Sequence, residues 1–191
     1  VLETCLGAKV GLIGTNQNMI GTEIIPSKRT TPDSLELMRL FAKMAEKNVD
    51  YAIMEVSSHS LVLDRVTACT FDVGAFTNIT QDHLDFHKTM EEYLKAKGIL
   101  FQISKNGAIN ADDPAAKQLL ELSTCKKMLT YGVENECDMR ASNVELRENG
   151  VFFVLNYEGK EYHVELGIPG KFSVYNALTA LSALAVSGIP V

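Results

Sequence analysis

Short apolar runs rich in β-forming residues alternate along this chain with segments of helical periodicity, and this alternation limits the possible folds more than any other feature of the sequence. The runs predict strands at residues 9–13, 50–56, 71–76, 108–110 and 128–132. Helical patterns fall between them, at residues 32–47, at residues 90–104 and after Pro114. Strands separated by helices pair in parallel through right-handed crossovers. The sequence therefore predicts an α/β fold with a mostly parallel sheet flanked by helices, in which residues 50–56 form a buried strand.

The pattern changes near Asp138. Apolar and polar residues then alternate in three short runs, which are separated by the turn sequences Glu148-Asn149-Gly150 and Glu158-Gly159-Lys160. These features predict a three-stranded antiparallel meander. A final helix is predicted at residues 173–187. We expect one domain over residues 1–191, with a parallel part at 1–137, the meander at 138–168 and the last helix at 169–191.

Composition excludes several classes of protein. The 191 residues are 46% hydrophobic and 22% charged, which is ordinary for a globular protein. A net charge of −6 without a basic block argues against nucleic acid or an anionic membrane as the main partner. The four cysteines form no CxxC pair and do not cluster with histidine, as expected of reduced thiols in a cytoplasmic protein. No apolar run reaches the roughly 18 residues that a membrane span needs.

Polar residues follow the predicted strand 50–56 directly. Glu55 is placed either to bind magnesium at the carboxyl edge of the sheet or to end the strand in a turn. Ser57 and Ser58 are suited to bind an anion or to cap the next helix. Upstream, Thr31 is the candidate N-cap of the helix at residues 32–47, and Asp33 favours its positive end.

The densest polar stretch, residues 77–87, follows the strand at 71–76. His83 and His87 are four residues apart and would share a helical face. They lack the central glutamate of HExxH and an evident third ligand, so a metal site, a phosphate site and a surface loop all stay open. Polar residues thus follow successive strands, which is how α/β proteins assemble one site at the carboxyl edge.

Three further positions carry candidate chemistry. Lys97 lies in a helix that is expected to pack its apolar residues, so it either reaches solvent or is partly buried with a lowered pKa that allows covalent modification. Asp112 or Asp113 is expected to open the helix after Pro114, or to join the site. Tyr175 and Asn176 begin the last helix, where they could cover and read a base or simply pack.

Seven spaced motifs, in order over essentially the whole chain, resemble those of the central, ATP-binding domain of the Mur ligase family. They are Thr30-Thr31-Pro32 and residues 54–61, 76–78, 82–87, 96–101, 110–113 and 170–177. The sequences Ser57-Ser58-His59 and Asp82-His83-Leu84-Asp85-Phe86-His87 favour the branch that extends UDP-MurNAc-L-Ala-D-Glu over sister ligases such as folylpolyglutamate synthases.

The resemblance implies a P-loop NTPase-like domain of an ATP-dependent ligase in peptidoglycan synthesis, the pathway behind cell shape and division. Such an enzyme adds meso-diaminopimelate or L-lysine through an acyl phosphate and needs ATP and Mg²⁺. The implied catalytic residues are Glu55 and His83, each a magnesium ligand, and Lys97, a carbamylated lysine that helps to hold the metal. The implied binding residues are Thr30, Thr31, Ser57 and Arg65 for the UDP-MurNAc-peptide, and Asn176, Asn110 and Asp113 for ATP.

The chain departs from the family at one point, because no GxxxxGK[ST] phosphate loop occurs in it. In the family that loop lies about one helix upstream of the segment that matches residues 9–15. We therefore expect a piece of a longer ligase, without its N- and C-terminal domains, that turns over no ATP by itself. Two other classes remain open: a metal-dependent hydrolase using Glu55, His83 and His87, and a non-catalytic nucleotide-binding module in which Lys97 stays unmodified.

Overall fold

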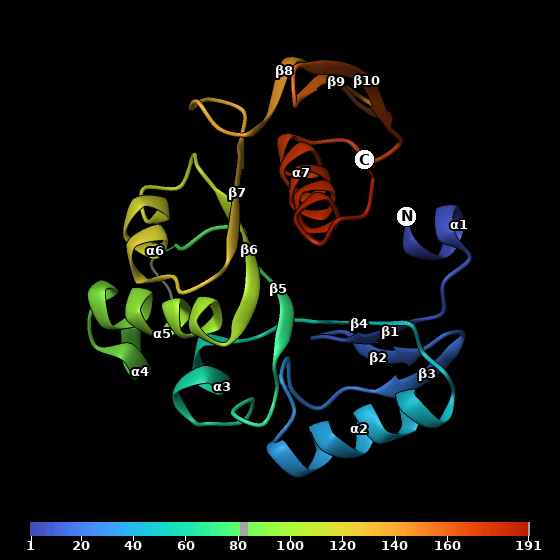
Figure 1. The fold of residues 1–191 in the computed structure, drawn as a ribbon, viewed down its shortest axis with the longest axis vertical. Helices are drawn as coiled ribbons and strands as arrows, with labels where there is room; N and C mark the ends of the chain where they lie inside the picture. The colour runs from blue at the N-terminus through green and yellow to red at the C-terminus, as the bar shows by residue number, and fades with distance from the viewer. Residues whose placement is uncertain (81–83, 191) are drawn as a thin grey trace. The chain divides into compact units, whose positions relative to one another are not determined.

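A computed structural model describes residues 1–80 and 84–190, which divide into two compact units, Val1–Cys69 and Thr70–Val191. The first unit holds a four-stranded sheet in the order β3-β2-β1-β4 (Figure 1). The second holds a six-stranded sheet in the order β10-β9-β8-β7-β6-β5. Within the described residues, no helix is both long enough and apolar enough to cross a membrane.

In the first unit, β1 (Val10–Ile13) pairs in parallel with β4 (Tyr51–Met54) and antiparallel with β2 (Gln17–Ile20). β2 continues into β3 (Glu23–Pro26) through a tight turn in which Gly21 has a φ of 57°. This hairpin was not predicted from the sequence. The unit also holds two short helices, α1 (Leu2–Leu6) and α3 (Ser58–Val62), and one longer helix.

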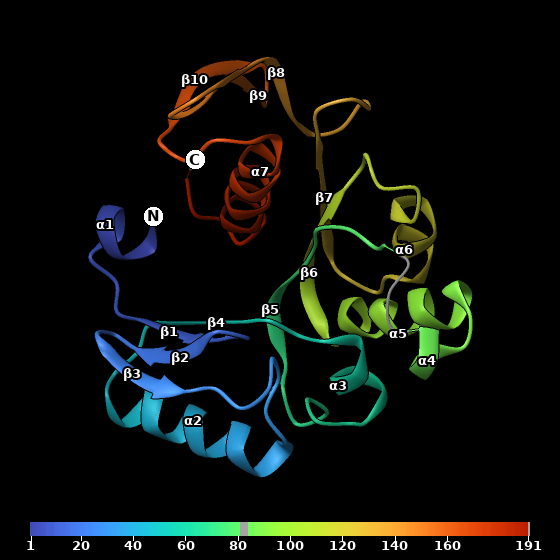
Figure 2. The ribbon, with the colours of Figure 1, turned by 180° about the vertical axis from the view of Figure 1, so that it is seen from behind.

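Helix α2 (Ser34–Glu46) packs along one face of this sheet (Figure 2). Leu37, Leu40 and Met44 recur at helical spacing and are buried. The prediction that Thr31 caps this helix is wrong, because the side chain of Asp33 accepts the Glu36 amide at 3.0 Å. Pro32 separates Thr31 from that position, and the Thr31 hydroxyl bonds elsewhere.

The prediction that residues 50–56 form a buried strand is also wrong for this unit. β4 lies at the edge of its sheet, and the side chains of Tyr51 and Ile53 are 38% and 49% exposed. Their alternation matches that of β1, since Tyr51 pairs with Val10 and Ile53 with Leu12. All four side chains therefore share one face of the sheet, opposite the face on which Met44 of α2 approaches Gly11.

The second unit is parallel at its centre, where β5 (Phe71–Phe76), β6 (Ser104–Asn110), β7 (Lys127–Gly132) and β8 (Met139–Arg147) pair in sequence. β9 (Gly150–Tyr157) and β10 (Lys160–Leu166) add the predicted antiparallel strands. The meander therefore continues the parallel sheet. The predicted α/β class with a three-stranded meander is confirmed.

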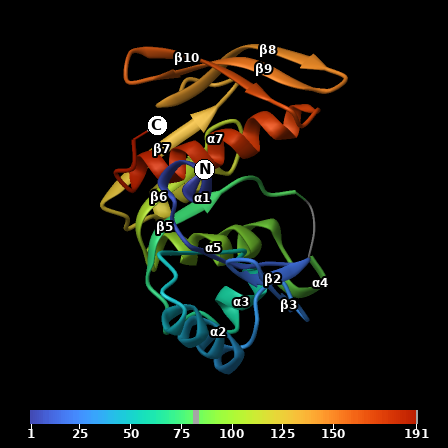
Figure 3. The ribbon, with the colours of Figure 1, turned by 90° about the vertical axis from the view of Figure 1, so that its right-hand side faces the viewer.

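Helices cover both faces of the parallel strands in the second unit. α4 (Leu84–His87), α5 (Met90–Gln102) and α6 (Ala116–Leu122) lie on one side, and α7 (Lys171–Val186) lies on the other (Figures 1 and 2). The meander extends over α7 (Figure 3). The prediction that Asp112 or Asp113 opens the helix after Pro114 is wrong, because α6 begins at Ala116. One core joins the sheet to α7 around Tyr131, Val174 and Leu178.

Candidate functional site

Glu55 lies at the carboxyl edge of the first sheet, just beyond β4. Its Oε2 accepts the Thr15 amide at 3.1 Å and also the Thr15 hydroxyl. That hydroxyl lies 3.1 Å from the Thr30 hydroxyl. Thr15 follows β1, the parallel neighbour of β4, so the two strand ends bring these oxygens together. Gly14 leaves room for the carboxylate, since a Cβ there would lie 3.0 Å from Glu55 Oε1.

Thr31 joins the other predicted residues of the first unit. Thr31 is 1% exposed, and its hydroxyl donates to the Glu55 carbonyl at 2.9 Å and accepts the Ser57 amide at 3.0 Å. The Arg65 guanidinium donates to the Thr31 carbonyl at 3.2 Å. Ser57 caps α3 by accepting the Ser60 amide at 3.2 Å, which is the capping role that the sequence favours. Thr30, Thr31, Glu55, Ser57 and Arg65 thus form one cluster.

Thr31→Val should destabilise this cluster while keeping the shape of the side chain. We expect the free energy of unfolding to fall by about 1–3 kcal/mol, because the Ser57 amide and the Glu55 carbonyl each lose their bond to the buried Thr31 side chain. Urea unfolding at neutral pH measures the loss. Thr67→Val is the control, since the exposed Thr67 hydroxyl bonds Asp64 in a surface turn. Equal losses in both variants would show that Thr31 has no special role.

The oxygens around Glu55 suit magnesium, which prefers hard oxygen donors and usually takes one or two carboxylates together with substrate phosphates. The carboxylate of Glu55 is exposed, and the hydroxyls of Thr15 and Thr30 lie beside it. Among the residues that the structure describes, no three or more His, Cys, Asp and Glu side chains are grouped to hold a metal. This donor set therefore fits a metal that is completed by a ligand's own oxygens.

Lys97 lies on α5 in the second unit and is half-buried. Its Nζ lies 5.1 Å from the centre of the Tyr93 ring and 6.0 Å from that of Phe76. Burial lowers the pKa of Lys97, and the Asp113 carboxylate opposes the shift in part. The fraction of neutral amine at neutral pH is therefore larger than for a lysine in water. Of the two predicted environments, the structure shows the partly buried one.

Asn110 and Asp113 face the segment that leaves β5. Asn110 Nδ2 donates to the Thr77 carbonyl at 2.8 Å, and its Oδ1 accepts the Asp112 amide at 3.0 Å. Asp113 accepts the Ile79 amide at 2.9 Å through Oδ2 and the Ala115 amide at 2.9 Å through Oδ1. The polar atoms of both side chains thus bond the backbone.

Asp112 joins the β7–β8 loop to the last helix. Its carboxylate accepts the amides of Val133, Glu134 and Asn135 at 2.6, 3.1 and 2.7 Å, and the Tyr175 hydroxyl at 2.8 Å. Burial raises the pKa of Asp112, but these four donors to the charged form outweigh it and hold the pKa below its usual range. Tyr175, a candidate base cover, thus contacts a carboxylate, whereas Asn176 beside it is exposed.

Of the two histidines in the dense polar stretch, the structure describes only His87. Asp82 and His83 lie outside the described residues. His87 is 4% exposed, and its ring stacks on Tyr93 with centroids 4.9 Å apart. The predicted ligand pair therefore has one member that is packed against an aromatic side chain.

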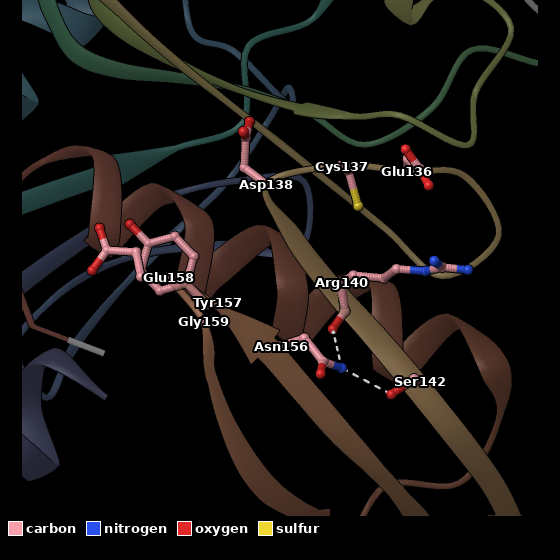
Figure 4. Close-up of a pocket in the computed structure, with 9 residues that line it drawn as sticks. All are labelled: Glu136, Cys137, Asp138, Arg140, Ser142, Asn156, Tyr157, Glu158 and Gly159. Carbon is pink, nitrogen blue, oxygen red and sulfur yellow. Dashed lines mark hydrogen bonds between the residues drawn. The ribbon is translucent and has the colours of Figure 1, made fainter.

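A surface hollow of about 570 Å³ lies beside the meander (Figure 4), and none of the predicted site residues lines it. It is lined in part by Cys137, Asp138 and Tyr157, and Asn156 bridges β8 through Ser142 Oγ at 2.8 Å. Burial, with the nearby Asp112 and Asp138 carboxylates, raises the pKa of Cys137 to about 11. A protonated thiol is a poor nucleophile, so the hollow offers no reactive cysteine.

Sequence reasoning missed Thr15 and Tyr131. Thr15 could have been found, because it ends a strand that was predicted to be parallel to the one before Glu55. Tyr131 lies inside a predicted strand, where a tyrosine is ordinarily read as core. Nothing in the sequence pattern marks the bond of its hydroxyl to the end of β5, two strands away.

Three comparisons place the chain among known proteins. A family model of the Mur ligase middle domain matches residues 1–184. The UDP-N-acetylmuramoyl-L-alanyl-D-glutamate–2,6-diaminopimelate ligase of Clostridium botulinum is 49% identical over 184 residues, 96% of this chain and 38% of that protein. A ligase of the same name from Clostridium acetobutylicum is 50% identical over 185 residues, 97% of this chain and 38% of that protein. The chain thus spans well under half the length of these relatives.

Solved structures of Mur ligases share this fold. The structure of a UDP-N-acetylmuramoyl-L-alanyl-D-glutamate–2,6-diaminopimelate ligase superposes with a TM-score of 0.91 at 28% identity, over 99% of this chain and 40% of that one. MurF from Thermotoga maritima in complex with ADP gives 0.72 at 18% identity over the whole of this chain and 41% of that one, which shows a shared fold. The family model covers nearly every residue from the first helix to the last, and the chain therefore belongs to the Mur ligase middle domain family.

Proposed function

We propose that the protein containing this chain is an ATP-dependent ligase of peptidoglycan synthesis that adds 2,6-diaminopimelate to UDP-MurNAc-L-Ala-D-Glu in the cytoplasm. The observation that carries the proposal is the identity of 49–50% to two ligases of that name over almost the whole chain. Those names favour diaminopimelate over the L-lysine that the sequence left open.

The proposed reaction has two steps. The terminal carboxylate of UDP-MurNAc-L-Ala-D-Glu attacks the γ-phosphorus of ATP, which releases ADP and leaves an acyl phosphate. The neutral amine of the amino acid then attacks the acyl carbon, and the tetrahedral intermediate expels phosphate as the amide forms and the amine loses a proton. The first step brings negative oxygens together, and the second develops negative charge on the carbonyl oxygen of the tetrahedral intermediate, so positioning and electrostatic stabilisation supply most of the catalysis.

We assign magnesium to Glu55 in the first unit, and to His83 and Lys97 in the second. Bound there, Mg²⁺ would offset the repulsion between the γ-phosphate and the attacking carboxylate. A cationic lysine would repel the metal, so Lys97 must first change its charge. Its neutral amine can add to CO₂ and lose a proton, which gives a carbamate anion. The lowered pKa of Lys97 supports this step, because it increases the neutral fraction of the amine.

We assign substrate binding to the cluster of the first unit and base recognition to α7. Thr30, Thr31, Ser57 and Arg65 would hold the UDP-MurNAc-peptide, with the Arg65 guanidinium suited to a phosphate or carboxylate. Asn176 is exposed on α7, where its amide can bond the edge of adenine. We also assign ATP binding to Asn110 and Asp113, whose side chains bond the backbone of the segment that leaves β5.

The test follows phosphate release by the full-length protein from Mg-ATP and UDP-MurNAc-L-Ala-D-Glu, with a panel of amino acids offered one at a time. We expect turnover with meso-diaminopimelate and much less with L-lysine, and none from residues 1–191 alone. Turnover with L-lysine alone would overturn the substrate assignment. Failure with every amino acid would reject the ligase and direct the same assay to folate acceptors.

A further inference from the structure

Tyr131 places a polar group in the centre of the second unit. It is 0% exposed, and its hydroxyl donates to the Phe76 carbonyl at 2.8 Å while it accepts the Thr179 hydroxyl at 2.6 Å. Burial raises the pKa of Tyr131 to about 12, although the Thr179 bond lowers it in part, so the hydroxyl keeps its proton at neutral pH. Both bonds cross between elements, since Tyr131 lies on β7, Phe76 ends β5 and Thr179 lies on α7.

The Phe76 bond is the first of three side-chain contacts to the segment that leaves β5, residues 76–79. Asn110 bonds the Thr77 carbonyl, and Asp113 bonds the Ile79 amide. Strand pairing between β5 and β6 ends at Phe76, which is paired with Ile109. Beyond the last strand pair, side chains therefore supply the hydrogen bonds of the backbone. The ring of Phe76 lies 6.0 Å from Lys97 Nζ, so this segment borders the proposed metal-binding lysine.

The other bond of Tyr131 reaches the helix that carries Asn176. Thr179 lies one turn beyond Tyr175 on α7, and its hydroxyl is also 2.8 Å from the Tyr175 carbonyl. Thr179 and Tyr175 thus anchor one side of α7, through Tyr131 and Asp112, while Asn176 stays exposed. One buried chain of hydrogen bonds therefore joins the base-recognition helix to the strand end beside Lys97.

We propose that Tyr131 is a positioning residue whose hydroxyl holds residues 76–79 and helix α7 at a fixed separation, so that the base end and the phosphoryl-transfer end of ATP stay aligned. The inference rests on the proposed function and adds a fully buried residue that would act through the elements it bonds. Its physical basis is the steep dependence of transfer reactions on placement, for which an error of about 1 Å costs roughly a hundredfold.

Tyr131→Phe in the full-length ligase tests the proposal, because it removes the hydroxyl and keeps the ring. We expect kcat to fall about tenfold or more while the KM for ATP and the Kd for ADP change less than about threefold, since alignment is lost without loss of a ligand contact. Thr179→Val should lower kcat in the same direction, and Thr179→Ser, which keeps the hydroxyl, should restore it.

Ser104→Ala is the stability control. Ser104 is 6% exposed at the start of β6, and its hydroxyl donates to the Leu100 carbonyl at 2.6 Å. The variant loses one buried hydroxyl bond at the far end of the strand, so it should lower the melting temperature without changing kcat. If Tyr131→Phe behaves like Ser104→Ala, Tyr131 is structural and the inference is wrong. If the wild-type ligase itself shows no turnover, the proposed function fails and the inference fails with it.

Discussion

Lys97→Ala in the full-length ligase should lower kcat about a thousandfold or more, because it removes the carbamate that would help to hold Mg²⁺, and with it the charge that offsets the repulsion between negative oxygens. The residual activity of Lys97→Ala should rise when formate or acetate is added, since a small carboxylate can occupy the space of the lost carbamate. Both results are read from initial rates of phosphate release at saturating substrates. The prediction follows from a half-buried amine, close to two aromatic rings, whose pKa is lowered by burial.

Lys95→Ala provides a matched control on the same helix. Lys95 is exposed, and its ammonium pairs with Glu91 at 2.7 Å, one turn earlier. Both charges of this pair stay in water and gain little from each other, so this variant should keep its kcat and nearly all its stability. If Lys97→Ala retains activity comparable to Lys95→Ala, the carbamate mechanism is wrong. The non-catalytic nucleotide-binding class would then regain support.

Elements with clear periodicity were predictable, and the exceptions have physical causes. Residues 71–76 were predicted as a strand and form one, because their apolar run pairs in parallel with β6 at the edge of the six-stranded sheet. The β2–β3 hairpin was missed because β2 carries the polar residue Asn18. That side chain is 1% exposed, and its Oδ1 accepts the Gly14 amide at 3.3 Å. A buried asparagine that is satisfied by a backbone amide gives no apolar pattern.

The exposure of β4 has a different cause. Its sequence, Tyr51-Ala52-Ile53-Met54, is apolar enough for a buried strand, and strand formation itself was predicted correctly. Burial depends on what covers the strand, and β4 has a partner on one side only within the described sheet. Hydropathy along a chain indicates how readily a strand can be buried. Which helix or strand covers it is decided by the tertiary structure.

The candidate site was predictable where one topological rule applied. Parallel strands end at a common edge, so polar residues such as Glu55 and Ser57 could be assigned to one site from the sequence alone, and both hydrogen-bond Thr31. The contacts of Asn110, Asp112 and Asp113 were not predictable in the same way. Each of the three also bonds a backbone group 21–34 residues away, whose position depends on strand register and loop path.

Asp112→Asn should give the largest loss of stability in the second unit. The carboxylate accepts three amides of the β7–β8 loop and the Tyr175 hydroxyl, whereas an asparagine has one acceptor oxygen and turns an NH₂ group toward those donors. We expect the free energy of unfolding at pH 7 to fall by about 2–4 kcal/mol. Amide hydrogen exchange at residues 133–135 should become faster, and the free energy of opening derived from it should fall by a similar amount.

The pH dependence of that loss identifies its cause. The pKa of Asp112 is lower in the folded protein than in the unfolded chain, so the carboxylate stabilises the fold above about pH 4, and this contribution disappears as pH falls through the folded-state pKa. The difference between wild type and Asp112→Asn in urea unfolding should therefore shrink on acidification. Asp72→Asn, which breaks only the exposed Lys105 pair, should cost less than about 0.5 kcal/mol. A loss at Asp112 that stays constant down to pH 3 would mean that shape, and not charge, holds the loop and α7 together.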